Sequence, residues 1–367
     1  MNWQQWTFSI LDTCFFREAL PFNAGEGGYT ATKGIFPPAM TTLQGAVRTA
    51  LALERGWRPG EVALWPKELG GPDDLGELEL RGPYLLFEDQ PYFPMPLILL
   101  EKSGHFTRLT PGEPVTCDLG CVRLPVPERR LEGAKLPEGY YLSRDGLCAV
   151  LDGVIPSTED IKKAEELWAE EVRVGIERQD STRTALEGHL YNCVHVRPAA
   201  NVKLVVFVSG IPSDWQVAGR RVVPLGGEGR LAAIEITPAE PAGILPSVPL
   251  ICGEDGKLRF TVTLVTPGWY GKPQDVQRVI REGPPGIPGR CVSACIGKVQ
   301  QVGGWDLANQ QPRPLMPVLP PGSTWFYEAG ATDAGQVARL HGQCLGFRAA
   351  YGFGQIAIGR WEEKKNE

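Results

Sequence analysis

Residues 352–359 read Gly-Phe-Gly-Gln-Ile-Ala-Ile-Gly, and residues 227–234 read Gly-Glu-Gly-Arg-Leu-Ala-Ala-Ile. Each stretch is a Gly-x-Gly turn that runs directly into a short apolar segment typical of a strand. Because two parts of the chain end in the same way, the pair indicates duplication of one βαββαβ unit. The sequence therefore predicts an α+β fold made of two ferredoxin-like (RRM-like) units.

The first unit is expected to cover residues 1–240. Its predicted strands are 6–11, 202–208 and 231–236, and its first helix runs from Thr41, as N-cap, to about Arg55. The apolar stripe of that helix comprises Leu43, Ala46, Val47, Ala50 and Leu51, which places Arg48 on another face. Residues 57–156 are rich in Pro and Gly and predict an irregular insertion.

A second helix is expected at about 159–171, with Ser157 as its cap. Strands at 172–176 and 190–196 flank a polar stretch, which predicts a long hairpin with its loop at about 177–189.

The second unit is expected to cover residues 241–367. It begins after a Pro-rich joint and contains predicted strands at 258–265, 323–328 and 355–361, a further segment near 291–302, and a helix near 333–345.

Composition leaves the function open. The formal net charge of −6 lacks the basic surplus that dedicated nucleic-acid binders usually show, although a small basic groove among acidic surfaces is compatible with it. The longest apolar runs are far shorter than the roughly 20 residues of a membrane span, and the first residues do not resemble a secretion signal. A cytoplasmic protein without membrane contact is expected.

The nine cysteines are scattered, which argues against a disulfide scaffold. The pairs Cys117/Cys121 and Cys291/Cys295 raise the possibility of zinc, but zinc knuckles usually have a two-residue gap and nearby His or Cys partners. Half-buried free thiols are the favoured interpretation, and no metal or cofactor is predicted.

Three features could bind a phosphodiester backbone. Near the second glycine turn, Gly352 and Gly354 allow close backbone approach, and Arg348 could contact phosphate; a plain tight turn is the alternative. The polar loop offers the forked guanidinium groups of Arg178 and Arg183, although such loops are usually only solvated. The helix amino terminus at Thr41 and Thr42 is the third candidate.

Catalytic motifs have little support in the sequence. The four histidines, His105, His189, His195 and His341, are dispersed, and the spacing of His189 and His195 suits no common metal pair. Neither a Gly-x-Ser-x-Gly elbow nor a His-Glu-x-x-His helix occurs.

Several motifs together resemble one family. They are Asp12-Thr13-Cys14-Phe15-Phe16-Arg17 with Pro21-Phe22-Asn23-Ala24-Gly25, Phe36-Pro37-Pro38 with Thr41-Thr42-Leu43, the hairpin residues from Val174 to Tyr191, Gly303-Gly304-Trp305-Asp306, and Gly352-x-Gly354. The sequence from about residue 6 to 361 thus resembles the RAMP superfamily of CRISPR proteins, and specifically the third subunit of the type III-B (Cmr) effector complex, which is similar to the Cas five group.

This resemblance implies a non-catalytic subunit for antiviral defence. It would hold the 5′ handle of the CRISPR RNA and bridge the large polymerase-like subunit to the backbone filament. The loop at 177–189 would act as a thumb. The residues predicted to contact RNA are Arg17, Asn23, Thr41, Thr42, Arg48, Arg178, Thr182, Arg183, Thr184, Tyr191, Gly227, Gly229, Arg348, Gly352 and Gly354.

Two alternatives remain open. A RAMP endoribonuclease that processes precursor CRISPR RNA shares the glycine loop, but it often uses a histidine near the first helix, and residues 1–100 contain none. A purely structural subunit without RNA contact is the other, and the arginines of the polar loop speak against it only mildly.

Overall fold

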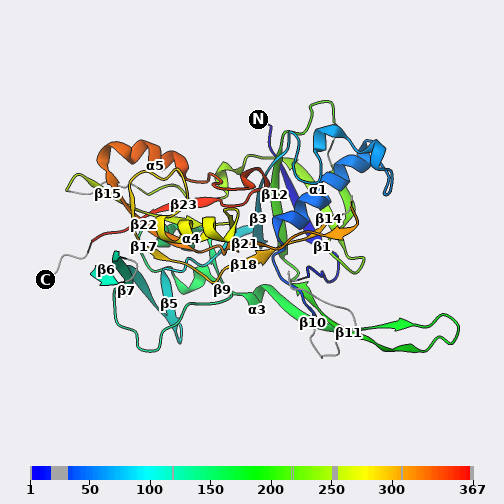
Figure 1. Ribbon diagram of the computed structural model, residues 1–367, viewed down its shortest axis with the longest axis horizontal. Coiled ribbons are helices and arrows are strands. Elements are labelled where there is room, and N and C mark those ends of the chain that lie inside the picture. Colours follow the sequence, from blue (N-terminus) through cyan, green and yellow to red (C-terminus); the bar gives the residue numbers. More distant parts are fainter. Residues whose placement is uncertain are drawn as a thin grey trace.

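The structure is a computed structural model that describes residues 2–17, 32–117, 120–215, 217, 219–249, 255–306 and 309–363 (Figure 1). At residues 32, 33, 117, 177 and 185–191 this description covers the backbone only. Two antiparallel sheets form the body of the molecule. No helix among the described residues is long and apolar enough to cross a membrane.

The first sheet has eight strands. Their order is β13 (Gly219–Pro224), β14 (Leu231–Pro238), β1 (Gln4–Ile10), β12 (Val202–Ser209), β3 (Glu79–Phe87), β4 (Gln90–Pro94), β8 (Tyr140–Ser143) and β9 (Ile161–Lys163). Helix α1 (Met40–Glu54) packs Leu43, Val47 and Leu51 into the same core as Trp6 and Phe8 of β1. This confirms the predicted apolar stripe of the first helix.

The second sheet has four strands, in the order β17 (Arg290–Cys295), β22 (Thr324–Gly330), β15 (Lys257–Leu264) and β23 (Ile356–Arg360). Helices α4 (Pro273–Glu282) and α5 (Ala334–Leu340) contribute Val276 and Val337 to a core with Trp325 of β22. The neighbouring residue Phe326 points to the other side, into a core shared with β3, β12 and helix α2 (Arg144–Leu151). Successive side chains of β22 therefore point to opposite faces, and those on one face pack against the first sheet.

The two sheets share one strand order. In the first, β1, β3, β12 and β14 follow one another along the chain and lie in the spatial order β14-β1-β12-β3. In the second, β15, β17, β22 and β23 lie in the order β23-β15-β22-β17. Both glycine turns precede the fourth of these strands. The repeat seen in the sequence thus corresponds to equivalent places in the two halves. The last strand of the first set ends at Pro238, and the first strand of the second set begins at Lys257.

Smaller elements complete the fold. A projecting sheet contains β10 (Trp168–Arg178), β11 (Ala185–Pro198) and β2 (Thr32–Lys33), and an arm contains β5 (Leu99–Lys102), β6 (His105–Cys117) and β7 (Gly120–Pro127). The short strands are β16 (Gly268–Trp269), β18 (Gln300–Val302), β19 (Trp305–Asp306), β20 (Gln311–Pro312) and β21 (Met316–Leu319). The short helices include α3 (Ala164–Leu167) and the 3-10 turn η6 (Ala349–Tyr351).

The prediction of an irregular insertion at 57–156 is wrong. This range contains strands β3 to β8 and α2, and β3 pairs with the central strand β12 through Leu204↔Leu85 and its neighbours. Gly82 and Pro83 both lie within β3, so a strand occupies a stretch whose Gly and Pro favoured a loop.

The predicted helix at 159–171 is also wrong. Residues Ile161–Lys163 form edge strand β9 on β8, and β10 already begins at Trp168. The ring of Trp168 packs edge-on against Phe36 and Tyr141, so tertiary contacts outweigh the local helical pattern.

Helix boundaries differ from expectation in three places. Helix α1 begins at Met40 with Ala39 at the N-cap, so Thr41 lies in the first turn and is not the cap. Helix α5 is shorter than the expected 333–345. Helix α4 was not expected, although Pro273 in its first turn and the spacing of Val276, Val279 and Ile280 are typical helix signals.

Candidate RNA interface

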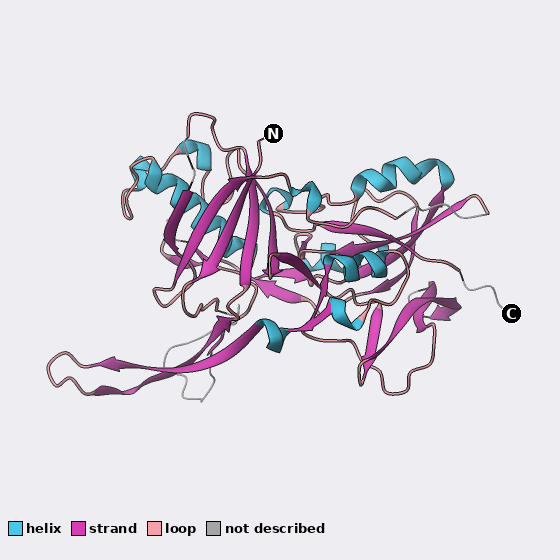
Figure 2. Ribbon diagram, turned by 180° about the vertical axis from the view of Figure 1, so that it is seen from behind, coloured by secondary structure: helices cyan, strands magenta, loops and turns pink. Residues whose placement is uncertain are grey.

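The hairpin of β10 and β11 projects from the body of the molecule, as both ribbon views show (Figures 1 and 2). Its strands pair from Trp168↔Pro198 to Ile176↔Leu190, and a bulge precedes the pair Arg178↔Ala185. This confirms the hairpin expected from the sequence. The turn contains fewer residues than the predicted loop at 177–189, because β11 already begins at Ala185.

Hydrogen bonds organise the hairpin tip. The amide of Gln179 donates to the carbonyl of Thr184 at 2.9 Å, and the amide of Arg183 donates to the carbonyl of Gln179 at 2.8 Å. The hydroxyls of Thr182 and Thr184 lie 2.7 Å apart. The tip is therefore a defined turn that presents its side chains outward.

Arg178 and Arg183 are the cations of this tip, and both are exposed. Neither forms an ion pair with any side chain that the structure describes. Arg183 adopts a left-handed backbone (φ 57°), which non-glycine residues rarely do. Two guanidinium groups are thus available to bind an anion.

One face of β10 is apolar and open to solvent. Val172, Val174 and Ile176 are 66, 64 and 48% exposed. Neighbouring β-branched side chains with so much exposed surface are typical of a contact surface for another molecule.

A network of charges lies at the root of the hairpin. Asp12 accepts hydrogen bonds from Arg197 at 2.9 Å, Arg230 at 3.3 Å and Arg173 at 3.4 Å. Glu171 bonds the same Arg197 and Arg173. The hydrogen bond from Arg197 is the main reason that the pKa of Asp12 is lowered. These arginines were not predicted, because they lie far apart in the sequence.

The first glycine turn borders this network. Gly227 and Gly229 are exposed, and the amide of Gly227 donates to the carbonyl of Phe15 at 2.9 Å. Arg17, two residues after Phe15, is exposed, and its backbone pairs with that of Gly34. The structure thus brings the first glycine turn close to the hairpin root through residues 12–15.

The second glycine turn has a different setting. Gly352 and Gly354 are buried, and a Cβ atom on Gly354 would lie 2.1 Å from the carbonyl oxygen of Leu345. Here the glycines permit close packing, which requires no RNA. Their direct contact with RNA stays a prediction.

Arg348, just before this turn, has a left-handed backbone (φ 62°) and donates to the carbonyl of Asp73 and to the hydroxyl of Tyr351. Asp73 belongs to the first half and Arg348 to the second, so this contact lies at the seam between the two halves. In the sequence, Arg348 is remote from the hairpin.

Arg48, which the sequence placed on another face of α1 than the apolar stripe, is itself buried in the structure. Its guanidinium donates to the carbonyls of Gly70 at 2.8 Å and Gly71 at 2.7 Å. Burial also lowers its pKa. These contacts give Arg48 a structural role. Thr41 is connected to it only indirectly, because Gln44 donates to the carbonyl of Thr41 and accepts from Arg48.

Three predicted contacts remain to be placed. Thr42 lies in the first turn of α1, where its amide donates to the carbonyl of Ala39. Asn23 lies outside the described residues. Tyr191 belongs to β11, but the description there covers the backbone only.

The histidines with described side chains are not arranged around one centre. His195 is buried, 3.1 Å from the hydroxyl of Thr13, and Nδ1 of His341 accepts from the amide of Ile358 at 3.1 Å. Among the described residues, no three His, Cys, Asp or Glu side chains are grouped so that they could hold a metal ion. Burial raises the pKa of the Cys291 and Cys295 thiols to about 12.

These histidines predict a pH dependence of stability. Burial lowers the pKa of His341 and of His195 below the ordinary value of 6.5 in the folded protein. The unfolded chain therefore binds more protons, and the free energy of unfolding should fall as the pH drops through about 6.5. Urea denaturation at about pH 7.5 and about pH 5.5 measures the loss. His341→Asn should reduce that loss, whereas the exposed control His105→Asn should not; equal losses in both variants would contradict the assignment.

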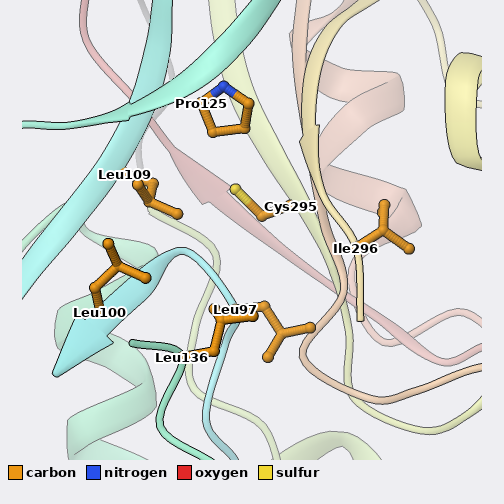
Figure 3. A pocket seen from close by; sticks show the side chains of 7 residues that line it. All are labelled: Leu97, Leu100, Leu109, Pro125, Leu136, Cys295 and Ile296. Atoms are coloured by element: carbon orange, nitrogen blue, oxygen red, sulfur yellow. The ribbon is translucent and has the colours of Figure 1, made fainter. Parts of the chain in front are cut away.

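An apolar pocket of about 260 Å³ lies between the arm and the second sheet (Figure 3). Leu100, Leu109 and Pro125 line it from one side, and Cys295 and Ile296 from the other. Such a lining suits an apolar side chain and offers no charge for a phosphate. The exposed cations of the hairpin are the better candidate site.

Comparison with known families places the chain among the CRISPR-associated proteins. It belongs to the family described as CRISPR-associated protein (Cas_Cmr3), whose model matches residues 6–361. The family resemblance inferred from the sequence motifs is thereby confirmed.

Solved structures give a weaker likeness. A chain of the type III-B Cmr-beta complex bound to cognate target RNA has a TM-score of 0.50 at 16% identity, with 88% of this chain and 86% of that chain covered. A chain of the same complex bound to cognate target RNA and AMPPnP has a TM-score of 0.49 at 15% identity, with the same coverage. At this identity the first match indicates a shared fold. No curated protein matches the sequence.

Proposed function

We propose that the chain is a non-catalytic, RNA-binding subunit of a type III-B CRISPR effector complex. It would hold the 5′ handle of the CRISPR RNA and join the large polymerase-like subunit to the backbone filament. Membership of the Cas_Cmr3 family supports this role. So does the similarity to a chain from an RNA-bound Cmr-beta complex, at the level of the fold.

One observation carries the RNA-binding part of the proposal: Arg178 and Arg183 stand exposed on a projecting hairpin without an ion pair to any described side chain. With a net charge of −6, the chain as a whole repels RNA, so the attraction must be local. By contrast, the arginines at the hairpin root already bind Asp12 and Glu171. The tip is therefore the better phosphate ligand.

We also propose that each half is a ferredoxin-like unit. In support, the second half follows the order β15-α4-β17-β22-α5-β23 along the chain, and its first strand lies between the fourth and the third. The first half repeats that strand order, and along the chain β13 lies between β12 and β14, where the second helix would stand.

The main alternative, an endoribonuclease, predicts cleavage. We expect purified protein to bind a short repeat-derived RNA and to leave it intact, with or without magnesium, since His195 is buried, His341 is half-buried, and both are hydrogen-bonded to protein groups. Denaturing gel electrophoresis of the RNA, incubated with and without the protein, shows whether it has been cut. Specific cleavage that is lost in His189→Ala or His341→Ala would assign the chain to the nucleases instead.

A further inference from the structure

A loop at residues 70–74 lies against three arginines at the seam between the two halves. Arg48 donates to the carbonyls of Gly70 and Gly71. Arg313 donates to the carbonyl of Pro72 at 2.7 Å, and Arg348 to that of Asp73. Successive backbone carbonyls thus hold guanidinium groups that come from both halves of the chain.

The two carboxylates of this loop have different roles. Asp74 accepts from the amides of Gly76 at 2.8 Å and Gly71 at 3.2 Å, which lowers its pKa and fixes the shape of the loop. Asp73 instead accepts from Arg313 at 3.2 Å and Arg348 at 3.3 Å, and its side chain is 81% exposed. The two arginine side chains are only 29 and 19% exposed, but an ion pair to a carboxylate that faces solvent contributes little to stability. The Asp73 carboxylate is therefore a replaceable ligand of the two arginines.

An exposed aromatic ring adjoins Arg348. Phe347 is 54% exposed, and the guanidinium carbon of Arg348 lies 5.4 Å from the centre of its ring. Arg348 has a left-handed backbone and stands between Phe347 and the buried glycine turn. An aromatic face beside guanidinium donors is the combination that binds a base and its phosphate in single-stranded nucleic acid.

We propose that Arg313, Arg348 and Phe347 form a second binding site, for one nucleotide of single-stranded RNA, in which the Asp73 carboxylate takes the place of the phosphate in the free protein. The phosphate would accept hydrogen bonds from both guanidinium groups, and the base would stack on Phe347. Asp306, 3.6 Å from Arg313, would keep that side chain in position. This inference rests on the proposed RNA-binding function and adds a site remote in sequence from the hairpin.

The sharpest test is a gain of binding. Asp73→Asn removes the competing charge, while the bonds from Arg313 and Arg348 to the backbone carbonyls still hold the loop. Binding of a short fluorescein-labelled single-stranded RNA should become about three- to tenfold tighter, because one negative charge beside the site is lost. Its salt dependence should become steeper, because two cations then neutralise phosphate. Circular dichroism should show that Asp73→Asn has the same fold as the unaltered protein.

Loss variants complete the test. Arg313→Ala with Arg348→Ala, and separately Phe347→Leu, should each weaken RNA binding by about tenfold, whereas Phe347→Tyr should bind normally. The matched control is Arg281→Ala with Arg339→Ala, which removes two exposed charges from α4 and α5.

The outcomes separate the two proposals. If Asp73→Asn changes neither affinity nor salt dependence while Arg178→Ala with Arg183→Ala binds weakly, the seam site is refuted and the proposed function stands. If the unaltered protein binds no RNA at all, both proposals fail.

Discussion

Replacing Arg178 and Arg183 together by alanine should weaken the binding of guide RNA by well over tenfold. Each lost contact between an arginine and a phosphate costs on the order of 1–2 kcal/mol and lowers the salt dependence by about one unit. Both side chains are exposed, and neither forms an ion pair with a described carboxylate, so RNA can contact them without displacing a described partner. Filter binding by the assembled complex at several salt concentrations measures both effects.

This variant should fold normally, because solvated side chains at a hairpin tip contribute little to stability. The control, Arg281→Ala with Arg339→Ala, removes the same charge from the helices of the second sheet and should bind RNA as the unaltered protein does. If the folded hairpin variant keeps its affinity and its salt slope, the tip is only a solvated loop and the RNA must lie elsewhere.

Gly354→Ala should destabilise the protein by about 3 kcal/mol or more. A left-handed alanine costs about 1–2 kcal/mol, and Gly354 has a φ of 72°. The added Cβ would also lie 2.1 Å from the carbonyl oxygen of Leu345, so backbone must shift. Hydrogen bonds to Pro267 and from Leu345 hold the turn on both sides and resist that shift. Urea denaturation followed by tryptophan fluorescence measures the change.

Gly229→Ala is the matched control in the first glycine turn. Gly229 also has a positive φ, of 62°, but no atom lies within 4 Å of an added Cβ. It should therefore cost only the conformational strain, about 1–2 kcal/mol. Similar losses in the two variants would show that packing is not what requires glycine at position 354.

The sequence predicted the parts of the fold that have local signals. The repeated Gly-x-Gly turns, the apolar stripe of α1 and the strands of the hairpin are all short-range patterns, and the structure contains them. The prediction for residues 57–156 failed because the strands of this range form by pairing with distant parts of the chain. Strand β3 of this range is held by β12. The helix expected at 159–171 failed for the same reason, because β9 is held by β8, and neither pairing leaves a trace in the local composition.

The candidate site shows the same limit. The exposed arginines of the tip could be predicted because a polar loop between two strands is a local feature. The burial of Arg48 could not, since it depends on carbonyls of the loop at Gly70 and Gly71. Nor could the bonds of Asp12 to Arg197 and Arg230, which the fold brings together across most of the first half.

The most direct measurement of the central claim is ultraviolet cross-linking of the complex purified from its host through this chain, with mass spectrometry of the cross-linked peptides. We predict that the complex contains CRISPR RNA and that the chain is cross-linked to the 5′ handle through peptides spanning the hairpin tip, residues 178–184. A purified complex that contains the RNA, but in which this chain carries no cross-link at the hairpin or at the seam, would contradict the account.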